Sequence, residues 1–368
     1  MQDTVKALQD LAHAYRGVLK EGGCKVIGIA GSNGKTTTRH LIHHVLTHAG
    51  LKGTQSPKSF NNHLGVPLTL LSGKPQDDFV ACEIGTNHPG EIDFLSAIAR
   101  PDIAVITSIG EEHLAFFKDL DGVIEEELSI GEHLPAGAYC IVDHSVPRDH
   151  PAIRDAVHRA SRFAGGAGLL QHILNPNHTP SIRCSFLAAW TALSVGVRAE
   201  DIRLALRCVE AVSGRWERLS FNHDVLVIND AYNANPSSVK MAIGDLDRWD
   251  RNDGRKVVVL GDMHELGERA MDYHCEIGRF MLDFTNLNDL ITIGPMAKQT
   301  FQSFVLDCGI KDDDRSFDAW SDDLPDKIAD LLQPGDTVLL KASRGMRLER
   351  LIPAIERRFG QAPPDEPT

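Results

Sequence analysis

The chain has 368 residues, of which 42% are hydrophobic and 24% charged, and its formal net charge is −13. These values are typical of a globular protein long enough for two or three domains. The excess of acidic over basic residues argues against electrostatic binding to nucleic acid or to anionic lipid. The sequence has neither a signal-peptide-like start nor a run apolar enough for a membrane span. We therefore expect a cytoplasmic protein that binds small molecules and neither nucleic acid nor membranes, in an oligomeric state that the sequence leaves open.

Residues 26–38 carry the pattern of a phosphate-binding loop. A β-branched run is followed by G-x-x-G-K-T at residues 31–36 and then by a helical segment. Glycines let backbone N–H groups close around phosphate oxygens, Lys35 can reach the β- and γ-phosphates, and the Thr36 hydroxyl can hold Mg²⁺. The sequence therefore predicts a nucleoside triphosphate site formed by Gly31, Ser32, Asn33, Gly34, Lys35, Thr36 and Thr37.

Helical segments flank this loop. Residues 2–20 place apolar side chains at helical spacing before the loop, and after it His40, His44 and His48 recur every four residues along one helix face. That spacing is compatible with a metal site, but no carboxylate or cysteine joins it in the sequence. The seven cysteines are scattered singly and are typical of reduced core thiols. We therefore favour a solvated histidine face.

Strand-like runs at residues 79–82, 103–106 and 139–142 alternate with helical stretches. This alternation predicts an α/β fold whose mostly parallel sheet has helices on both faces. Ligands of such sheets bind beyond the carboxyl ends of the strands. Glu83 follows the first run, and Glu111, Glu112 and His113 follow the second. A carboxylate and an imidazole beside the threonine of the loop predict a divalent-metal shell.

A second α/β unit follows the first. Residues 164–180 are rich in Gly, Asn, Pro and His and predict a loop, and helical patterns then cover residues 186–195 and 202–209. New strand runs occur at residues 225–228, 257–260, 290–293 and 337–340. We expect a first domain over residues 1–212, a second, Rossmann-like α/β domain over residues 213–360, and a disordered proline-rich tail over residues 361–368.

Together the motifs resemble the Mur ligase superfamily, most closely its branch that adds D-alanyl-D-alanine to a UDP-muramoyl tripeptide. The matching segments span nearly the whole chain and comprise residues 3–12, 31–37, 61–67, 83–92, 109–114, 230–236, 260–267 and 341–349. The resemblance implies a P-loop central domain and a Rossmann-like final domain. It also implies ATP- and Mg²⁺-dependent, ADP-forming amide synthesis, in which a small-molecule carboxylate becomes an acyl phosphate that an amino-acid or dipeptide amine attacks.

The resemblance also assigns roles to residues. Thr36 and Glu83 would hold one metal ion, and Glu83 with His113 a second. Arg215 would contact the phosphates, and Asp230 would bind the ribose hydroxyls. Asn61, Asn62, Asn233 and Asn235 would line the nucleotide and substrate cleft, although turn or cap roles are an open alternative for these four asparagines.

Three departures from the family pattern bear on function. Family members that act on UDP-muramoyl peptides carry an N-terminal uridine-binding domain, whereas this sequence starts at the central domain. The family's carbamylated lysine is replaced by Glu127, or by Glu126 after a one-residue shift, unless both belong to a solvated acidic run. The helix segment with the family's adenine-contacting asparagine has Ser185 instead.

From these features we expect a carboxylate–amine ligase whose acceptor is not a standard UDP-muramoyl peptide. Addition of D-alanyl-D-alanine to the muramoyl tripeptide is the alternative within the same class. A nucleotide-binding pseudoenzyme, or a subunit of a complex, is the alternative of another class. The retained Lys35, Thr36, Glu83, His113 and Arg215 favour an active ligase, with Lys35, His113, Glu127 and Arg215 as its catalytic residues.

Overall fold

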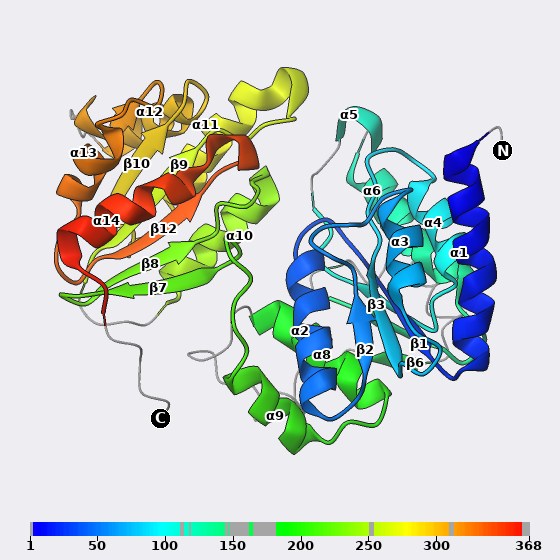
Figure 1. Ribbon diagram of the computed structural model, residues 1–368. Coiled ribbons are helices and arrows are strands. Elements are labelled where there is room, and N and C mark those ends of the chain that lie inside the picture. Colours follow the sequence, from blue (N-terminus) through cyan, green and yellow to red (C-terminus); the bar gives the residue numbers. More distant parts are fainter. Residues whose placement is uncertain are drawn as a thin grey trace. The chain divides into compact units, whose positions relative to one another are not determined.

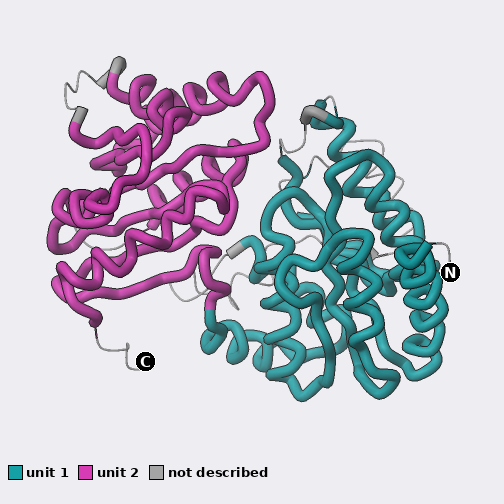
Figure 2. The backbone as a smooth tube through the Cα atoms, turned by 45° about the horizontal axis from the view of Figure 1, so that its top comes forward, with its two compact units in different colours: residues 1–210 teal, residues 211–368 magenta. Residues whose placement is uncertain are grey.

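The structure is a computed structural model with two compact units, residues 1–210 and residues 211–368 (Figures 1 and 2). It describes residues 3–110, 114–117, 119–143, 146, 162–164, 182–249, 254–308 and 313–362. The predicted loop lies outside the described residues except for its first residue, and so does the predicted tail beyond residue 362. Among the described helices, none is long and apolar enough to cross a bilayer.

Unit 1 is built on a six-stranded parallel sheet in the order β2-β3-β1-β4-β5-β6. Its strands are β1 (Lys25–Ala30), β2 (Gly53–Gln55), β3 (Phe79–Glu83), β4 (Ile103–Ile106), β5 (Tyr139–Val142) and β6 (Arg162–Ala164). Its helices are α1 (Thr4–Glu21), α2 (Lys35–His48), α3 (Gly65–Ser72), α4 (Glu91–Ala99), α5 (Leu114–Phe117), α6 (Leu120–Leu128), α8 (Ile182–Ser194) and α9 (Ala199–Arg207). The predicted parallel sheet is thus confirmed.

Helices cover both faces of this sheet, because alternate strand side chains point to opposite faces. Val26 and Val80 face a core shared with α1, α3, α4 and α6. Ile27 and Ala81 face a second core shared with α2, α8 and α9. β1, β3, β4 and β5 are buried on both faces and are mostly apolar in sequence, whereas the edge strand β2 is half-buried and polar.

Unit 2 has a second six-stranded sheet in the order β11-β10-β9-β12-β8-β7, parallel except for the antiparallel pair of β7 and β8. Its strands are β7 (Glu217–Phe221), β8 (Val225–Asn229), β9 (Lys256–Gly261), β10 (Asp289–Ile293), β11 (Ser316–Phe317) and β12 (Thr337–Lys341). Its helices are α10 (Pro236–Asp247), α11 (Ala270–Met281), α12 (Ala297–Cys308), α13 (Leu324–Leu331) and α14 (Ile352–Phe359). One face of the sheet shares a core with α13 and α14.

The strand order of unit 1 fixes where its polar residues meet. β1 lies between β3 and β4, and all three strands run in the same direction. The segments that leave their carboxyl ends therefore lie next to one another at one edge of the sheet. These segments are the predicted phosphate loop after β1, Glu83 at the end of β3, and residues 107–110 after β4.

Candidate active site

The phosphate loop joins β1 to α2, and its glycines are required by backbone geometry. Gly31 has φ 116°, and a Cβ there would lie 2.2 Å from Thr107 Oγ1. Gly34 has φ 89° and is the residue that precedes the first turn of α2. Only glycine adopts such angles readily. The loop therefore presents its last residues at the positive end of the α2 dipole, where phosphate binds favourably.

The segment after β4 holds the other side of the loop. Ser32 N–H donates to the carbonyl of Ser108 over 2.7 Å. Gly110 N–H donates to Ser32 Oγ over 3.0 Å, and Ser108 Oγ donates to the carbonyl of Asn33 over 3.2 Å. Hydrogen bonds thus tie the loop to the segment that follows the neighbouring strand β4.

Lys35 is folded back over its own loop. Its Nζ donates to the carbonyls of Gly31 over 2.5 Å and of Ser32 over 3.2 Å. The side chain is half-buried, so the ammonium stays at the loop rather than in bulk water. The arrangement keeps a positive charge where phosphate oxygens of a bound triphosphate would lie.

Glu83 is a buried carboxylate next to the loop, only 1% exposed. Thr36 Oγ1 donates to its Oε2 over 2.9 Å, and Asn61 Nδ2 donates to its Oε1 over 3.1 Å. Arg39 Nε lies 3.5 Å from the same Oε2. A hydroxyl and a carboxylate side by side at a phosphate loop are the hard oxygen donors that Mg²⁺ prefers, so these residues fit the metal ion.

Glu127 on α6 also reaches the loop. The side chain is fully buried, and Gly31 N–H donates to its Oε2 over 2.5 Å. Its Oε1 accepts no hydrogen bond from the described part of the chain. Burial raises the pKa of this carboxyl, against the opposing effects of the Lys35 charge and the Gly31 N–H. A buried oxygen that has no donor among the described residues, on a carboxylate that contacts the phosphate loop, fits a cation held there.

Glu126 has a different partner. Its carboxylate accepts from Gly90 N–H over 2.7 Å and from Ile92 N–H over 2.9 Å, at the start of α4. It therefore satisfies backbone donors that a helix N-terminus leaves open. Of the two glutamates considered for the lysine position, Glu127 is the one that contacts the loop.

The remaining predicted residues of unit 1 have mixed positions. Asn61 contacts Glu83, whereas Asn62 Oδ1 accepts from Leu64 N–H and Gly65 N–H in the turn that leads into α3. Thr37 is half-buried on α2. Glu111, Glu112 and His113 lie outside the described residues, so the proposed imidazole ligand stays a prediction.

In unit 2 the predicted residues lie just before β7 and just after β8, at the same end of this antiparallel pair. Asp230 Oδ1 accepts from Trp216 N–H over 3.1 Å, and Lys341 Nζ lies 2.8 Å from Asp230 Oδ2. The Arg215 guanidinium stacks over the Tyr232 ring, 4.1 Å from its centroid. Arg215 and Asp230 thus lie near one another at the beginning of this unit.

Two asparagines follow in the same loop. The carbonyl of Asn233 accepts from Lys341 Nζ over 2.8 Å, and Asn233 is exposed. The side chain of Asn235 accepts from Ser238 N–H and forms a capping box at the start of α10. The structure therefore gives Asn235 a capping role of its own.

Sequence reasoning missed two buried cations. Arg39, only 5% exposed, neighbours Glu83, and Lys341, only 3% exposed, holds the loop after β8 through Asp230 and Asn233. Lys341 carried a signal, because it ends a buried apolar strand at the edge where ligands of such sheets bind. Arg39 lies one helical turn after Lys35, and apart from that spacing nothing in the sequence indicated that it lies beside Glu83.

The histidine face differs from its prediction. His40 Nε2 and His44 Nε2 each lie 3.0 Å from a backbone carbonyl, of Glu210 and Ala205 respectively. Cys208, distant in sequence, lies beside His44 and His48. The expectation that no cysteine joins these histidines was wrong, because packing of α9 against α2 brings Cys208 to them.

Comparisons with known proteins agree over nearly the whole chain. Residues 29–163 match the Mur ligase middle domain, and residues 214–344 match the Mur ligase, glutamate ligase domain. The UDP-N-acetylmuramoyl-tripeptide–D-alanyl-D-alanine ligase of Bacillus subtilis is 33% identical over 96% of this chain and 79% of its own length.

Solved structures give the same result. MurF from Acinetobacter baumannii aligns with a TM-score of 0.81 and 26% identity over 96% of this chain and 81% of that one. MurF from Thermotoga maritima, in complex with ADP, aligns with a TM-score of 0.74 and 26% identity over 97% of this chain and 84% of that one.

Replacing Glu127 with glutamine should stabilise the nucleotide-free protein at neutral pH. Burial raises the native pKa of Glu127 above its ordinary value of 4.5, so the native state binds this proton more tightly than the unfolded chain. The Glu127 contribution to stability therefore falls as pH rises above that value and through the native pKa. A glutamine side chain has no charge to bury, so the variant does not lose this stability as pH rises. We therefore expect the Tm of Glu127→Gln to exceed that of wild type by an amount that grows from acidic to neutral pH.

Glu126→Gln is the matched control. Its carboxylate already has two N–H donors, so losing the charge should lower stability by about 1 kcal/mol. Thermal unfolding of both variants across that pH range checks the contrast. A Glu127→Gln protein less stable than wild type at neutral pH would show that the buried carboxylate of Glu127 does not lower the stability of the protein.

Proposed function

Because the chain belongs to the Mur ligase family, it is an ATP-dependent, ADP-forming ligase of a carboxylate and an amine, and we propose that Lys35, Thr36, Glu83 and Glu127 perform its phosphoryl-transfer step. Its cofactors are ATP and Mg²⁺. The observation that carries the proposal is the convergence of two buried carboxylates, Glu83 and Glu127, on one phosphate loop.

The chemical demand of this step is to neutralise negative charge. ATP supplies the phosphoryl group that converts the acceptor carboxylate to an acyl phosphate, and Mg²⁺ compensates phosphate charge when bound. The Lys35 ammonium adds positive charge at the loop, and Thr36 with Glu83 supplies oxygen ligands for a cation. The amine then attacks the acyl carbon, the C–O bond to phosphate breaks, and the amine loses one proton as the amide forms. Gly31 and Gly34 would allow the backbone of the loop to approach phosphate oxygens.

Glu127 takes the place of the family's carbamylated lysine in this proposal. Both groups present an anionic carboxyl oxygen, but the glutamate needs no CO₂ to form. Its shorter stem is compensated because α6 brings the carboxylate within 2.5 Å of Gly31 N. In this proposal the buried Oε1 of Glu127 is the oxygen available to the cation that Thr36 and Glu83 would hold.

Arg215, Asp230 and His113 keep the roles that the family resemblance implies. Support for the first two comes from their positions at one end of the antiparallel pair of β7 and β8, since Arg215 lies just before β7 and Asp230 just after β8, where Lys341 anchors Asp230. The pseudoenzyme alternative is weakened by the intact Lys35 and by the paired Thr36 and Glu83.

For the substrates, we propose addition of D-alanyl-D-alanine to a UDP-muramoyl tripeptide as the first candidate. The Bacillus subtilis relative and two from mycobacteria carry that name, at 29–33% identity over 95–96% of this chain. The expectation of a different acceptor rested on where the sequence begins, which supports no choice of acceptor. A different carboxylate remains the second candidate, and a cytoplasmic location stays a prediction.

Removing the charges at the loop should abolish most turnover. Lys35→Ala and Glu83→Gln should each lower kcat by on the order of a hundredfold or more, as expected for loss of one electrostatic stabiliser of the transition state. Phosphate release measured under saturating ATP and Mg²⁺ checks this. The matched controls are Lys6→Ala and Glu200→Gln, which alter exposed side chains on α1 and α9. Wild-type kcat in either loop variant would contradict the assignment.

Activity should not depend on CO₂. Because the Glu127 carboxylate needs no CO₂ to form, turnover in bicarbonate-free buffer should equal turnover with added bicarbonate.

Glu127→Gln should weaken the Mg²⁺ dependence of the reaction and lower turnover while the protein stays folded, and circular dichroism verifies folding. An unchanged Mg²⁺ titration in Glu127→Gln would remove Glu127 from the metal region and leave its contact with Gly31 as purely structural.

The substrate proposal is tested by coupling phosphate release to product mass. We expect ADP, phosphate and a UDP-muramoyl pentapeptide when the chain receives ATP, Mg²⁺, UDP-muramoyl tripeptide and D-alanyl-D-alanine. Parallel reactions contain a panel of other small carboxylates and amino acids. A faster reaction with another pair would favour the second candidate, and ATP binding without any product would favour the non-catalytic alternative.

A further inference from the structure

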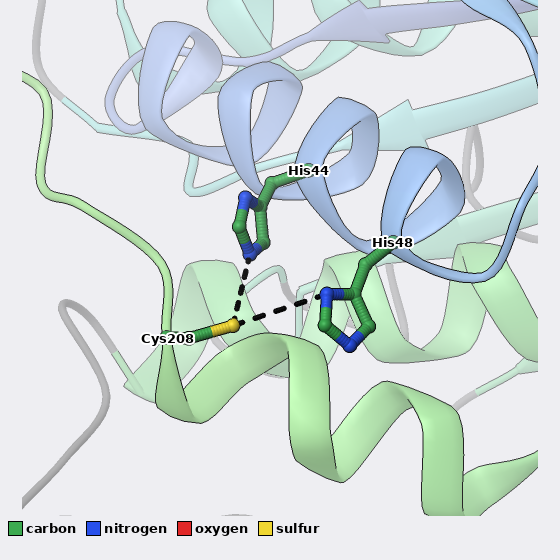
Figure 3. A group of neighbouring side chains, drawn as sticks. All are labelled: His44, His48 and Cys208. Carbon is green, nitrogen blue, oxygen red and sulfur yellow. Dashed lines mark hydrogen bonds between the residues drawn. The ribbon is translucent and has the colours of Figure 1, made fainter. Parts of the chain in front are cut away.

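A cluster of two imidazoles and a thiol lies outside the phosphate-loop site (Figure 3). Cys208 Sγ is 3.8 Å from His44 Nε2 and 3.9 Å from His48 Nδ1. The three ligand atoms all lie within 4.8 Å of one another. His44 is half-buried, and His48 and Cys208 are exposed.

Packing of the unit 1 core positions these three side chains. His44 and His48 are four residues apart on α2 and share one face, with ring centroids 6.0 Å apart. α9 lies against α2 because its apolar side chains Ile202 and Leu206 belong to the same core as those of α2. Cys208 is the residue that follows α9, so it meets the histidines without any contribution from a bound ligand.

The separations are close to those of a tetrahedral zinc site. Zn–S bonds of about 2.3 Å and Zn–N bonds of about 2.0–2.1 Å place sulfur and nitrogen about 3.6 Å apart. The two observed S···N separations exceed this by a few tenths of an ångström. Cys208 Sγ also lies 3.4 Å from the carbonyl of Ala205 and 3.5 Å from that of Leu204, which can take the thiol proton. Sulfur and the two ring nitrogens are all ligand atoms for a soft divalent cation once that proton is lost.

We propose that His44, His48 and Cys208 bind one thiophilic divalent cation of the zinc type, with a water molecule as the fourth ligand. The donor set of one sulfur and two nitrogens suits zinc-like ions and not Mg²⁺, which prefers oxygen. Binding displaces the thiol proton and uses the lone pair of His44 Nε2, which then gives up its contact with the Ala205 carbonyl. This site is independent of the proposed ligase function.

The cation would join two segments of unit 1. α2 begins at Lys35 of the phosphate loop, and Cys208 lies two residues before Glu210, the last residue of unit 1. A bound cation therefore fixes the last segment of unit 1 to the helix that extends from the phosphate loop.

Titration of the chelator-treated, full-length chain with Co²⁺ tests the proposal, because a cobalt–thiolate bond gives a charge-transfer absorption band. We expect a band that saturates at one equivalent, that Zn²⁺ removes, and that excess Mg²⁺ leaves unchanged. Cys208→Ser should abolish the band and weaken Zn²⁺ binding by about a hundredfold or more, since loss of a mere outer-shell partner already costs about 10–100-fold. His44→Gln and His48→Gln should also weaken binding.

The matched controls are His40→Gln, one turn earlier on the same helix, and Cys275→Ser, a free cysteine of unit 2. Both should keep the band and the wild-type affinity. The proposal is overturned if wild type gives no thiolate band, if the band survives in Cys208→Ser, or if the controls lose it equally. Circular dichroism of each variant separates loss of a ligand from loss of the fold.

Discussion

The parallel register of β1, β3 and β4 is the constraint on which the candidate site depends. Because the three strands run the same way and β1 lies in the middle, their exits share one edge of the sheet. Glu83 reaches Thr36 only for this reason, and Ser32 reaches residues 108–110 for the same reason. The two apolar cores on either face of the sheet hold this register, so the chemistry at the edge depends on apolar packing.

Buried charge is the second organising feature. Glu83 and Glu127 are almost fully withdrawn from water, and each costs folding free energy unless a partner compensates it. Glu83 has Thr36, Asn61 and a nearby Arg39, whereas Glu127 has one donor and an oxygen without a described partner. A site built for a triphosphate and its cation is expected to hold such incompletely compensated groups, because function and stability make opposing demands there.

Much of this could be predicted from the sequence. The central strands of both units are apolar runs, whereas β2 and β7 are not. The pattern at residues 31–36 correctly placed Lys35 and Thr36 at the start of a helix, because its spacing is local. The sequence pattern favoured Glu127 over Glu126 without excluding Glu126, and the difference matters because one residue on a helix changes the direction of a side chain by about 100°. The meeting of Cys208 with His48 could not be foreseen either, because it depends on how α9 packs across 160 residues of chain.

The two neighbouring glutamates of α6 also give that helix a mechanical role. Glu126 binds the first amides of α4, while Glu127 binds the amide of Gly31 in the phosphate loop. A rotation or slide of α6 that releases one carboxylate strains the other. Two adjacent carboxylates of one helix therefore connect the amide of Gly31 with the amides of Gly90 and Ile92.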